Sequence, residues 1–491
     1  MKKIHILFAA FSLLALTACD KNFDPVISGV LTPSNFPKTE NDFELYTLTA
    51  YKPFGSKWGY QEQSYQNMFF SPEYGHHLMF DICGDHFNTY TEWGGFFEGF
   101  SKADFTFLRT QGNTSHFEKV RHVSRMTQVI ADIQKADISD TKKNQLIAEA
   151  RMSRGFTMFF LLHLYGPVPV ITDIAKISTA AESDLKRPAR EAFVSAIDAD
   201  LEFAASNLPK AAAQYGRFNK GLALGIQMRL QLNEKNWAKA EKAGRDIVAL
   251  GYTLASDYTT LFRTSTERNT ETIWSVSCDA SADGNPLQGN FNPWSYYCLP
   301  SDYKGIRTGG GWGPKVGVFT PTWAFYDSFD KNDKRRTLMV ESYNNGARTR
   351  ANMRGPVLTK YPDEDSPQFQ GNDLVIVRYA DVLLMLAETI NNQAGPTAEA
   401  QGFINQVRKR AGIDNLPTAD AATKEAFNNA VLRERGWELY FEGVRRMDLI
   451  RHGKWDSALK AAGKTPGPSP YFPVPQYVID LKQGLEQTQG Y

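Results

Sequence analysis

Three histidines, His76, His77 and His86, lie close together in the sequence, and histidine is the side chain that most often binds metal ions. Their spacing fits no standard ligand set, so the sequence favours a structural or binding role for them. No G-x-S-x-G or H-E-x-x-H motif is present. The Gly-Lys-Thr at 463–465 lacks the first glycine of a phosphate-binding loop, because Ala458 stands in its place. The sequence therefore predicts a protein that is not an enzyme and needs no cofactor or metal.

Aromatic side chains are concentrated in two segments. Residues 51–105 contain 16 aromatics in 55 positions, where the chain average of 13% would give about 7, and residues 291–329 contain 11 in 39, against about 5. Sugars present flat C–H faces that stack on such rings, so the segments favour a glycan-binding surface; rings that pin long loops to a scaffold are the alternative. The rings that stand among Gly, Asn, Asp and Ser include Trp58, Tyr60, Tyr74, Trp93, Trp294, Tyr296, Tyr297, Trp312 and Trp323.

The segment RERGWELYFEGVRRMDLIRHGKW at 433–455 is rich in charge and resembles a site. Its apolar residues from Trp437 to Leu449 recur at roughly helical spacing, which predicts one structural helix. In such a helix the charged side chains would form near-neighbour ion pairs. These are Glu434, Glu438, Glu442, Arg445 and Arg446.

Residues 1–18 have the pattern of an export signal, with a basic start and an apolar stretch too short to span a bilayer. Leu16-Thr17-Ala18-Cys19 matches the bacterial lipobox, in which the cysteine thiol is acylated and becomes the new N-terminus. An acylated Cys19 would hold the protein on a membrane without a transmembrane helix. A secretory signal with an incidental cysteine is the alternative.

The other cysteines are Cys83, Cys278 and Cys298. An exported chain permits a disulfide, and one between Cys278 and Cys298 would close a short loop. Free thiols are the alternative, and Cys83 is unpaired in either case.

Helical periodicity dominates the rest of the chain. Apolar residues recur at helical spacing in 141–169, which ends at a Gly-Pro pair, and in 187–209. Helix–turn–helix pairs are expected at 221–251 and 379–412, as in tetratricopeptide-like repeats, which stack into solenoids. Residues 275–370 interrupt this pattern with Gly, Asn, Pro and aromatics. The predicted fold class is mostly α, with long irregular loops and minor β structure.

The net charge excludes one class of partner. Lys plus Arg number 55 and Asp plus Glu number 54, which leaves no electrostatic footprint for nucleic acid.

Several segments together resemble the SusD/RagB family of outer-membrane nutrient-binding lipoproteins of Bacteroidetes. They are LTPSNFPKTENDFELYTLTAY, AEARMSRGFTMFFLLHLYGPVPVIT, VIVRYADVLLMLAETINN, FINQVRKRAGI, LRERGWELYFEGVRRMDLIRHG and YFPVPQYVIDLKQGLEQTQGY. The resemblance implies a signal peptide at 1–18 and one SusD-like unit over 19–491. Its N-terminal half would span about 19–225 and its C-terminal half about 270–491.

The resemblance also implies a function. Such proteins sit on the cell surface, anchored in the outer membrane by an N-terminal lipid, as a lid over a SusC-like TonB-dependent transporter to which they pass an oligosaccharide. In the family, ligand residues come from the early aromatic loops and from the loop before a segment that is Pro321 to Tyr326 here. We therefore expect Trp93, Tyr296 and Trp312 to stack on the ligand, with Asp85, Asn88 and Arg307 as polar partners and Trp58, Tyr74 and Trp294 as further binding residues.

Two other functions stay open at this point. The same lid role would serve peptides or another nutrient. A lipid-anchored glycoside hydrolase is less favoured, but its carboxylate pair is defined by distance in space and leaves no sequence motif.

Overall fold

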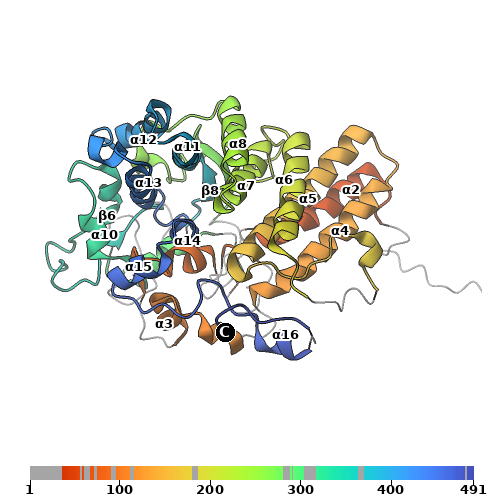
Figure 1. Cartoon of the computed structure of the whole chain (residues 1–491), viewed down its shortest axis with the longest axis horizontal. Coiled ribbons are helices and arrows are strands. Elements are labelled where there is room, and N and C mark those ends of the chain that lie inside the picture. Colours follow the sequence, from red (N-terminus) through yellow and green to blue (C-terminus); the bar gives the residue numbers. More distant parts are fainter. Residues whose placement is uncertain are drawn as a thin grey trace, which may run out of the picture.

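The computed structural model describes residues 36–55, 67–70, 75–89, 95–110, 115–179, 186–279, 291–303, 317–362, 370–481 and 484–491. It also describes the backbone of 58–59 and 288–289, and at 95–96 and 295–296 the backbone alone. Helices predominate, as the sequence predicts (Figure 1). Within these ranges no helix combines the length and apolar character needed to cross a bilayer.

The longer helices form one continuous array. In chain order they are α2 (Glu40–Thr47), α4 (Val120–Gln134), α5 (Asp140–Tyr165), α6 (Arg190–Asn207), α7 (Lys220–Asn233), α8 (Trp237–Ala249), α11 (Tyr379–Ala394), α12 (Ala398–Ala411) and α13 (Lys424–Glu438). Consecutive helices from α4 to α8 pack on one another, α8 then packs on α11, and α11 packs on both α12 and α13. Figure 1 shows the array crossing the molecule from α2 to α12. The two helix–turn–helix pairs predicted from the sequence are confirmed as α7–α8 and α11–α12.

Helix ends follow local chemistry. The Ser139 side chain accepts a hydrogen bond from the Lys142 amide at the start of α5, and Gly166 ends that helix with φ +75°. The Thr397 side chain caps α12 in the same way, and Gly412, with φ +82°, ends it. Because these signals are local, the boundaries expected from the sequence are close to those observed.

The remaining described α-helices have eight residues or fewer, and those labelled in Figure 1 lie below the array or at its edge. They are α3 (Gly95–Lys102), α9 (Trp294–Cys298), α10 (Trp323–Asp327), α14 (Arg445–Arg451), α15 (Trp455–Ala461) and α16 (Gln476–Leu481), with a π-helical turn at Leu78–Ile82.

Strands are short and pair antiparallel in twos. The pairs are β1 (Trp58–Gly59) with β4 (Gln288–Gly289), β2 (Phe87–Thr89) with β5 (Phe319–Pro321), β3 (Thr272–Val276) with β8 (Leu374–Arg378), and β6 (Met339–Val340) with β7 (Val357–Leu358). Each pair joins segments separated in the sequence, so the strands fasten irregular segments to one another. This matches the predicted mostly-α class with minor β structure.

The prediction of one helix over 433–455 is wrong. Helix α13 ends at Glu438, the chain turns at Phe441 and Gly443, which have φ +58° and +75°, and α14 begins at Arg445. The glutamates of this segment do not pair with neighbours along a helix. Glu434 bonds to Arg335 and Arg408, Glu438 to Arg335, Arg378 and Arg410, and Glu442 to Lys360 and Arg378.

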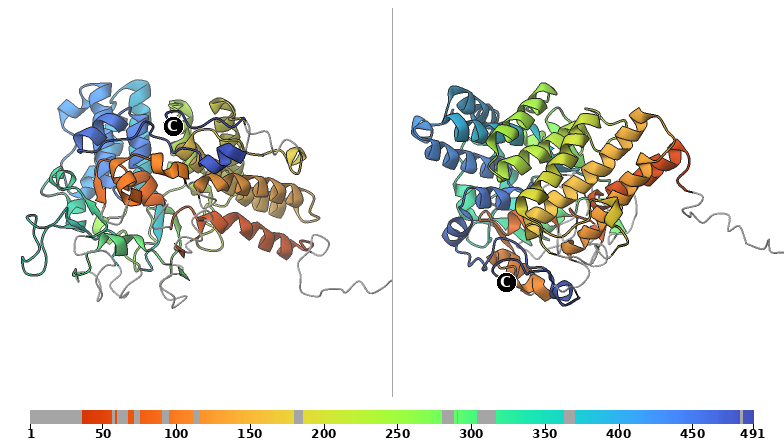
Figure 2. Two further views of the ribbon diagram at one scale, coloured as in Figure 1. Left: turned by 90° about the horizontal axis from the view of Figure 1, so that it is seen from below. Right: turned by 45° about the vertical axis from the view of Figure 1, so that its right-hand side comes forward.

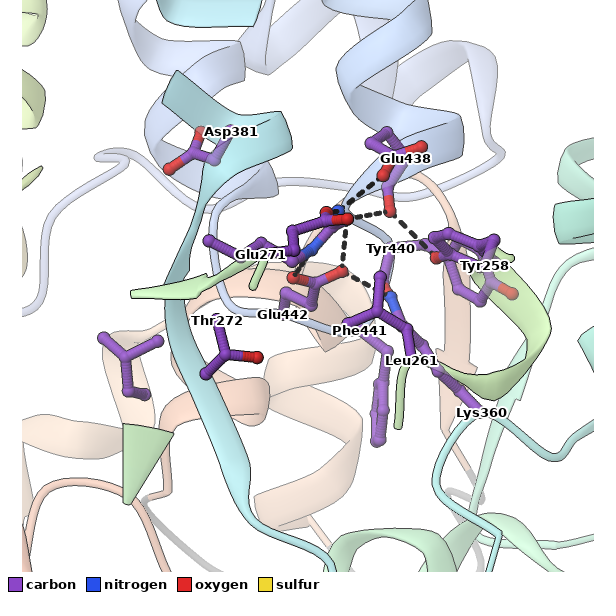
Figure 3. A network of polar contacts seen from close by, with 12 residues as sticks. Tyr258, Leu261, Glu271, Thr272, Lys360, Asp381, Glu438, Tyr440, Phe441 and Glu442 are labelled. Carbon is purple, nitrogen blue, oxygen red and sulfur yellow. Dashed lines mark hydrogen bonds and ion pairs between the residues drawn. The ribbon is translucent and has the colours of Figure 1, made fainter. Parts of the chain in front are cut away.

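Arg378, at the end of β8, is the centre of this buried ionic network. Figure 3 shows three of the glutamates that belong to the network, Glu271, Glu438 and Glu442. Nη1 of Arg378 lies 2.7 Å from a carboxylate oxygen of Glu271 and 2.5 Å from one of Glu438, and its Nε lies 2.7 Å from Glu442. All of these side chains are buried. The network thus joins the residue before β3, the end of β8 and the end of α13.

The network carries balanced charge. Burial alone would raise the pKa of the Glu438 carboxyl, but the charges of Arg410, Arg378 and Arg335 lower it below its ordinary value. Burial lowers the pKa of Lys360 to about 8 against the opposing charge of Glu442, so Lys360 is still mostly charged at neutral pH. Because each buried charge has a partner, the desolvation penalty is offset by attraction.

Cys83, Cys278 and Cys298 are buried free thiols. The disulfide that the sequence permitted between Cys278 and Cys298 is therefore not formed.

We expect Arg378→Gln to lower the free energy of unfolding by about 3–5 kcal/mol, since it leaves buried carboxylates uncompensated. Urea denaturation measures this. The control is Arg350→Gln, because Arg350 and its partner Asp327 are about half exposed, with side chains 53% and 48% accessible. That variant should lose no more than about 1 kcal/mol. Equal losses in the two variants would contradict the central role of Arg378.

Candidate functional site

The two aromatic segments singled out by composition meet in space. Strand β2 from the first pairs with β5 from the second, with Asn88 opposite Thr320. The pairing extends past the strands, since the Thr322 amide donates to the His86 carbonyl at 2.8 Å. Strands β1 and β4 add a second link between the two regions. Figure 2 (left) shows the orange early segment beside the green segment that precedes α10. We call the frame made by β2, β5, α9 and α10 the aromatic platform.

Several predicted binding residues lie outside the described residues. These are Tyr74, Trp93, Arg307 and Trp312, together with the lipidation site Cys19. For Trp58 and Tyr296 only the backbone is described, in β1 and α9 respectively. Their roles remain predictions.

Trp294 is not a surface ring. It is fully buried at the start of α9, and its indole N–H donates to the Phe69 carbonyl at 3.1 Å. The ring of His77 packs against it edge to face, with centroids 4.8 Å apart. The prediction that Trp294 is a ligand-binding residue is wrong, because its side chain is inaccessible. The ring instead ties α9 to the segment before the π-helical turn.

Asp85 and Asn88 differ in their surroundings. Both Asp85 oxygens accept hydrogen bonds from the Arg445 guanidinium, each at 2.8 Å, across 360 residues of sequence. Burial alone would raise the pKa of this carboxyl, but the charge and hydrogen bonds of Arg445 lower it below its ordinary value. Asn88 is partly exposed in the middle of β2. Asp85 therefore anchors the platform, and Asn88 is the better placed of the two for a ligand.

The sequence offered no sign of Arg445 as a partner of Asp85. It grouped Arg445 with the local charges of 433–455, because spacing along the chain carries no information on a contact this distant. The same applies to Phe325, whose ring stacks on His86 with centroids 3.9 Å apart.

The histidines of this region are neutral; His76 and His77 are buried, and the His86 side chain is only 13% accessible. Burial lowers the pKa of His76 and of His86 to about 3, and it lowers the pKa of His77 as well. Across the part of the chain that the structure describes, no three His, Cys, Asp or Glu side chains form a group suited to a metal ion. The three histidines serve as packing rings behind the platform.

A half-buried ring marks the described rim of the platform. Trp323, the first residue of α10, donates its indole N–H to the Met353 carbonyl at 3.1 Å. The Arg350 guanidinium lies 4.7 Å from the centroid of this ring. Aromatic and guanidinium groups of this kind can stack on a ligand and donate hydrogen bonds to it.

A cavity of about 330 Å³ opens between α6, α7 and α8. Charged side chains line it, among them Asp198 and Lys239, which pair with each other at 2.9 Å. None of its lining residues is aromatic, so it lacks the chemistry of the platform.

Comparison with known proteins places this architecture in a family. Residues 318–491 match the model of the SusD family, and residues 76–232 match a model described as starch-binding, associating with the outer membrane. SusD-like protein P25 of Formosa agariphila is 25% identical over 64% of this chain and 65% of its own length. SusD-like protein P2 of the same organism is 24% identical over 97% of this chain and 94% of its own.

Solved structures share the fold. A SusD homolog from Bacteroides thetaiotaomicron has a TM-score of 0.77 at 21% identity, covering 94% of this chain and 99% of its own. Surface glycan-binding protein A of that organism was solved in complex with laminarihexaose. It has a TM-score of 0.71 at 22% identity, covering 92% of this chain and 99% of its own. The helical array with its strand-fastened loops is thus that of SusD-like proteins. The two family models, the curated relatives and the structural neighbours together support a SusD-like protein, in agreement with the resemblance seen in the sequence.

We expect the free energy of unfolding to fall as pH is lowered from about 6.5 toward 3. The folded-state pKa of a histidine such as His86, about 3, lies below the unfolded value near 6.5. Between these values the unfolded chain binds more protons, so the stabilisation is complete above pH ~6.5 and is lost on acidification, by at most ~1.4 kcal/mol per pH unit for each such histidine.

Urea denaturation between about pH 7.5 and pH 5 checks this expectation. His86→Phe preserves the stack on Phe325 but cannot be protonated, so its stability should depend less steeply on pH than that of the parent. If the free energy of unfolding changes equally with pH in both proteins, His86 does not contribute to the pH dependence of stability.

Proposed function

We propose that this protein binds an oligosaccharide or polysaccharide at the outer surface of the outer membrane and delivers it to a SusC-like TonB-dependent transporter. The observation that carries the proposal is the meeting of the two aromatic segments at β2 and β5. Each segment alone is a run of loops, but the strand pair holds the two together over one buried core. Rigid rings lose little conformational entropy on binding, which suits recognition of flat sugar faces.

The family supports the class of ligand and the location. One matching model is described as starch-binding and associating with the outer membrane, and one structural neighbour was solved with laminarihexaose. The lipobox at Cys19 supports a lipid anchor, since acyl chains hold a protein at a membrane without a spanning helix. These observations favour a tethered binding protein over an enzyme.

Within the platform, we propose that Trp93, Tyr296 and Trp312 stack on the glycan, with Trp58 and Tyr74 extending the surface. Asn88 and Arg307 supply polar contacts, and Asp85 contributes by holding Arg445 and the β2 end of the platform. Trp323 with Arg350 lies at the described edge of the same surface.

We expect Trp93→Ala and Trp312→Ala to weaken glycan binding by about tenfold each, since a stacked ring contributes roughly 0.5–1.5 kcal/mol beyond the area it buries. Affinity electrophoresis in gels containing laminarin or starch measures the loss, and Tm should change little. A large fall in Tm would instead identify the ring as a packing residue.

Two further tryptophans provide controls. Trp237→Ala removes a partly exposed ring from α8, outside both aromatic segments, and should leave glycan retardation unchanged. Trp294→Ala removes a fully buried ring and should lower the free energy of unfolding by about 3–5 kcal/mol. If peptides bind to the protein while gels containing glycan do not slow its migration, the glycan proposal is contradicted. Hydrolysis of the glycan by the protein would instead indicate a hydrolase.

A further inference from the structure

The turn between α13 and α14 holds an aromatic residue in a strained conformation. Phe441 is fully buried and has φ +58°, in the left-handed region that bulky side chains rarely adopt. Such strain persists only where the surroundings over-determine it, and it marks places where geometry matters to function.

The buried ionic network holds the turn in this conformation. Glu438 and Glu442, on either side of the turn, are both bound to Arg378. The backbone is held as well, because the carbonyl oxygens of the turn accept hydrogen bonds from buried side chains. Arg378 and Tyr258 donate to Glu438, Lys360 donates to Tyr440, and Tyr361 donates to Phe441.

The far side of the turn is fixed by the π-helical turn of the early segment. The Gly443 amide donates to Asp81 at 2.6 Å, and the Arg445 amide donates to the other oxygen of the same carboxylate. Gly443 also permits a close approach: a Cβ there would lie 1.9 Å from Nε2 of His76. The position of the Phe441 ring is therefore set from both sides.

That ring lies where two elements of the aromatic platform meet. It stacks on His77 with centroids 4.1 Å apart and planes 7° from parallel. Two further rings pack near it. Its centroid lies 5.4 Å from that of Phe87, the first residue of β2, and 6.4 Å from that of Trp294, the first residue of α9. Phe441 thus connects the ionic network to the strand that carries Asn88 and to the helix that carries Tyr296.

We propose that Phe441 is a positioning residue of the glycan site: its strained turn transmits the rigidity of the Arg378 network to β2 and α9 and so sets the spacing of the binding rings. The proposal rests on the proposed function. The turn lets Glu442 reach Arg378, but glycine at 441 would adopt the same positive φ without strain, so the phenylalanine ring is held there at an energetic cost. A second unfavourable feature occurs at the same place, since among the described residues neither ring nitrogen of buried His77 has a hydrogen-bond partner.

The test compares Phe441→Leu with Phe427→Leu, a control that removes another fully buried phenylalanine, in α13. Both variants should lose thermal stability. Phe441→Leu should in addition weaken binding of laminarin or starch at least tenfold and speed amide hydrogen exchange in 87–89 and 294–298 at least tenfold. Phe427→Leu should leave both readouts at parental values when measured well below the Tm of each variant.

A further pair separates strain from positioning. Phe441→Gly relieves the positive φ that Phe441→Ala retains, so the glycine variant should have the higher Tm while binding glycan as weakly as the alanine variant. If Phe441→Leu does not fold, Phe87→Leu removes the same ring contact from the β2 side and should speed exchange in α9.

The outcomes distinguish the two proposals. Parental exchange in β2 and α9 of Phe441→Leu, or equal acceleration in Phe427→Leu, would overturn the positioning role. If the parent protein binds neither glycan, the proposed ligand class fails, and the exchange measurements still decide whether Phe441 positions the platform.

Discussion

Arg378 and the carboxylates of Glu271, Glu438 and Glu442 form the contact on which much of the C-terminal half depends. A buried arginine needs a partner for each edge of its guanidinium, and these glutamates come from two distant parts of the chain. Satisfying them brings together the start of β3, the end of β8 and the end of α13. The same demand stops α13 at Glu438, because the chain must turn there for Glu442 to reach Arg378.

From this centre the constraint extends in two directions. On one side, β8 leads directly into α11, which packs against α8 and closes the helical array across the gap in sequence. On the other side, the turn at Phe441 contacts the early segment: Asp81 accepts a hydrogen bond from the Gly443 amide, and the ring of His77 stacks on that of Phe441. The scaffold and the aromatic platform are therefore held by one set of buried charges. A binding protein gains from this arrangement, since a rigid frame preserves the spacing of the rings.

Much of the scaffold could be predicted because its signals are local. The spacing of apolar residues in 221–251 predicts α7 and α8, and Gly166 and Gly412 end helices where left-handed backbone is needed. Composition also located the two segments that meet in the platform. What could not be predicted was which rings in those segments are exposed. Trp294 and Trp323 stand in similar sequence surroundings, yet Trp294 is fully buried and Trp323 only partly so, because burial depends on neighbours from distant segments.

The sequence by itself therefore determined the class of fold, the positions of the long helices, the aromatic character of the platform and the family. Each of these follows from residue spacing or motif over a few turns of chain. Only the tertiary structure decided that Glu434, Glu438 and Glu442 bind distant cations, that Cys278 and Cys298 stay apart, and that Arg445 holds Asp85. The physical reason is the same in every case: a buried charge, thiol or ring takes its partners from whatever lies nearest in space, and for this chain those partners lie up to hundreds of residues away.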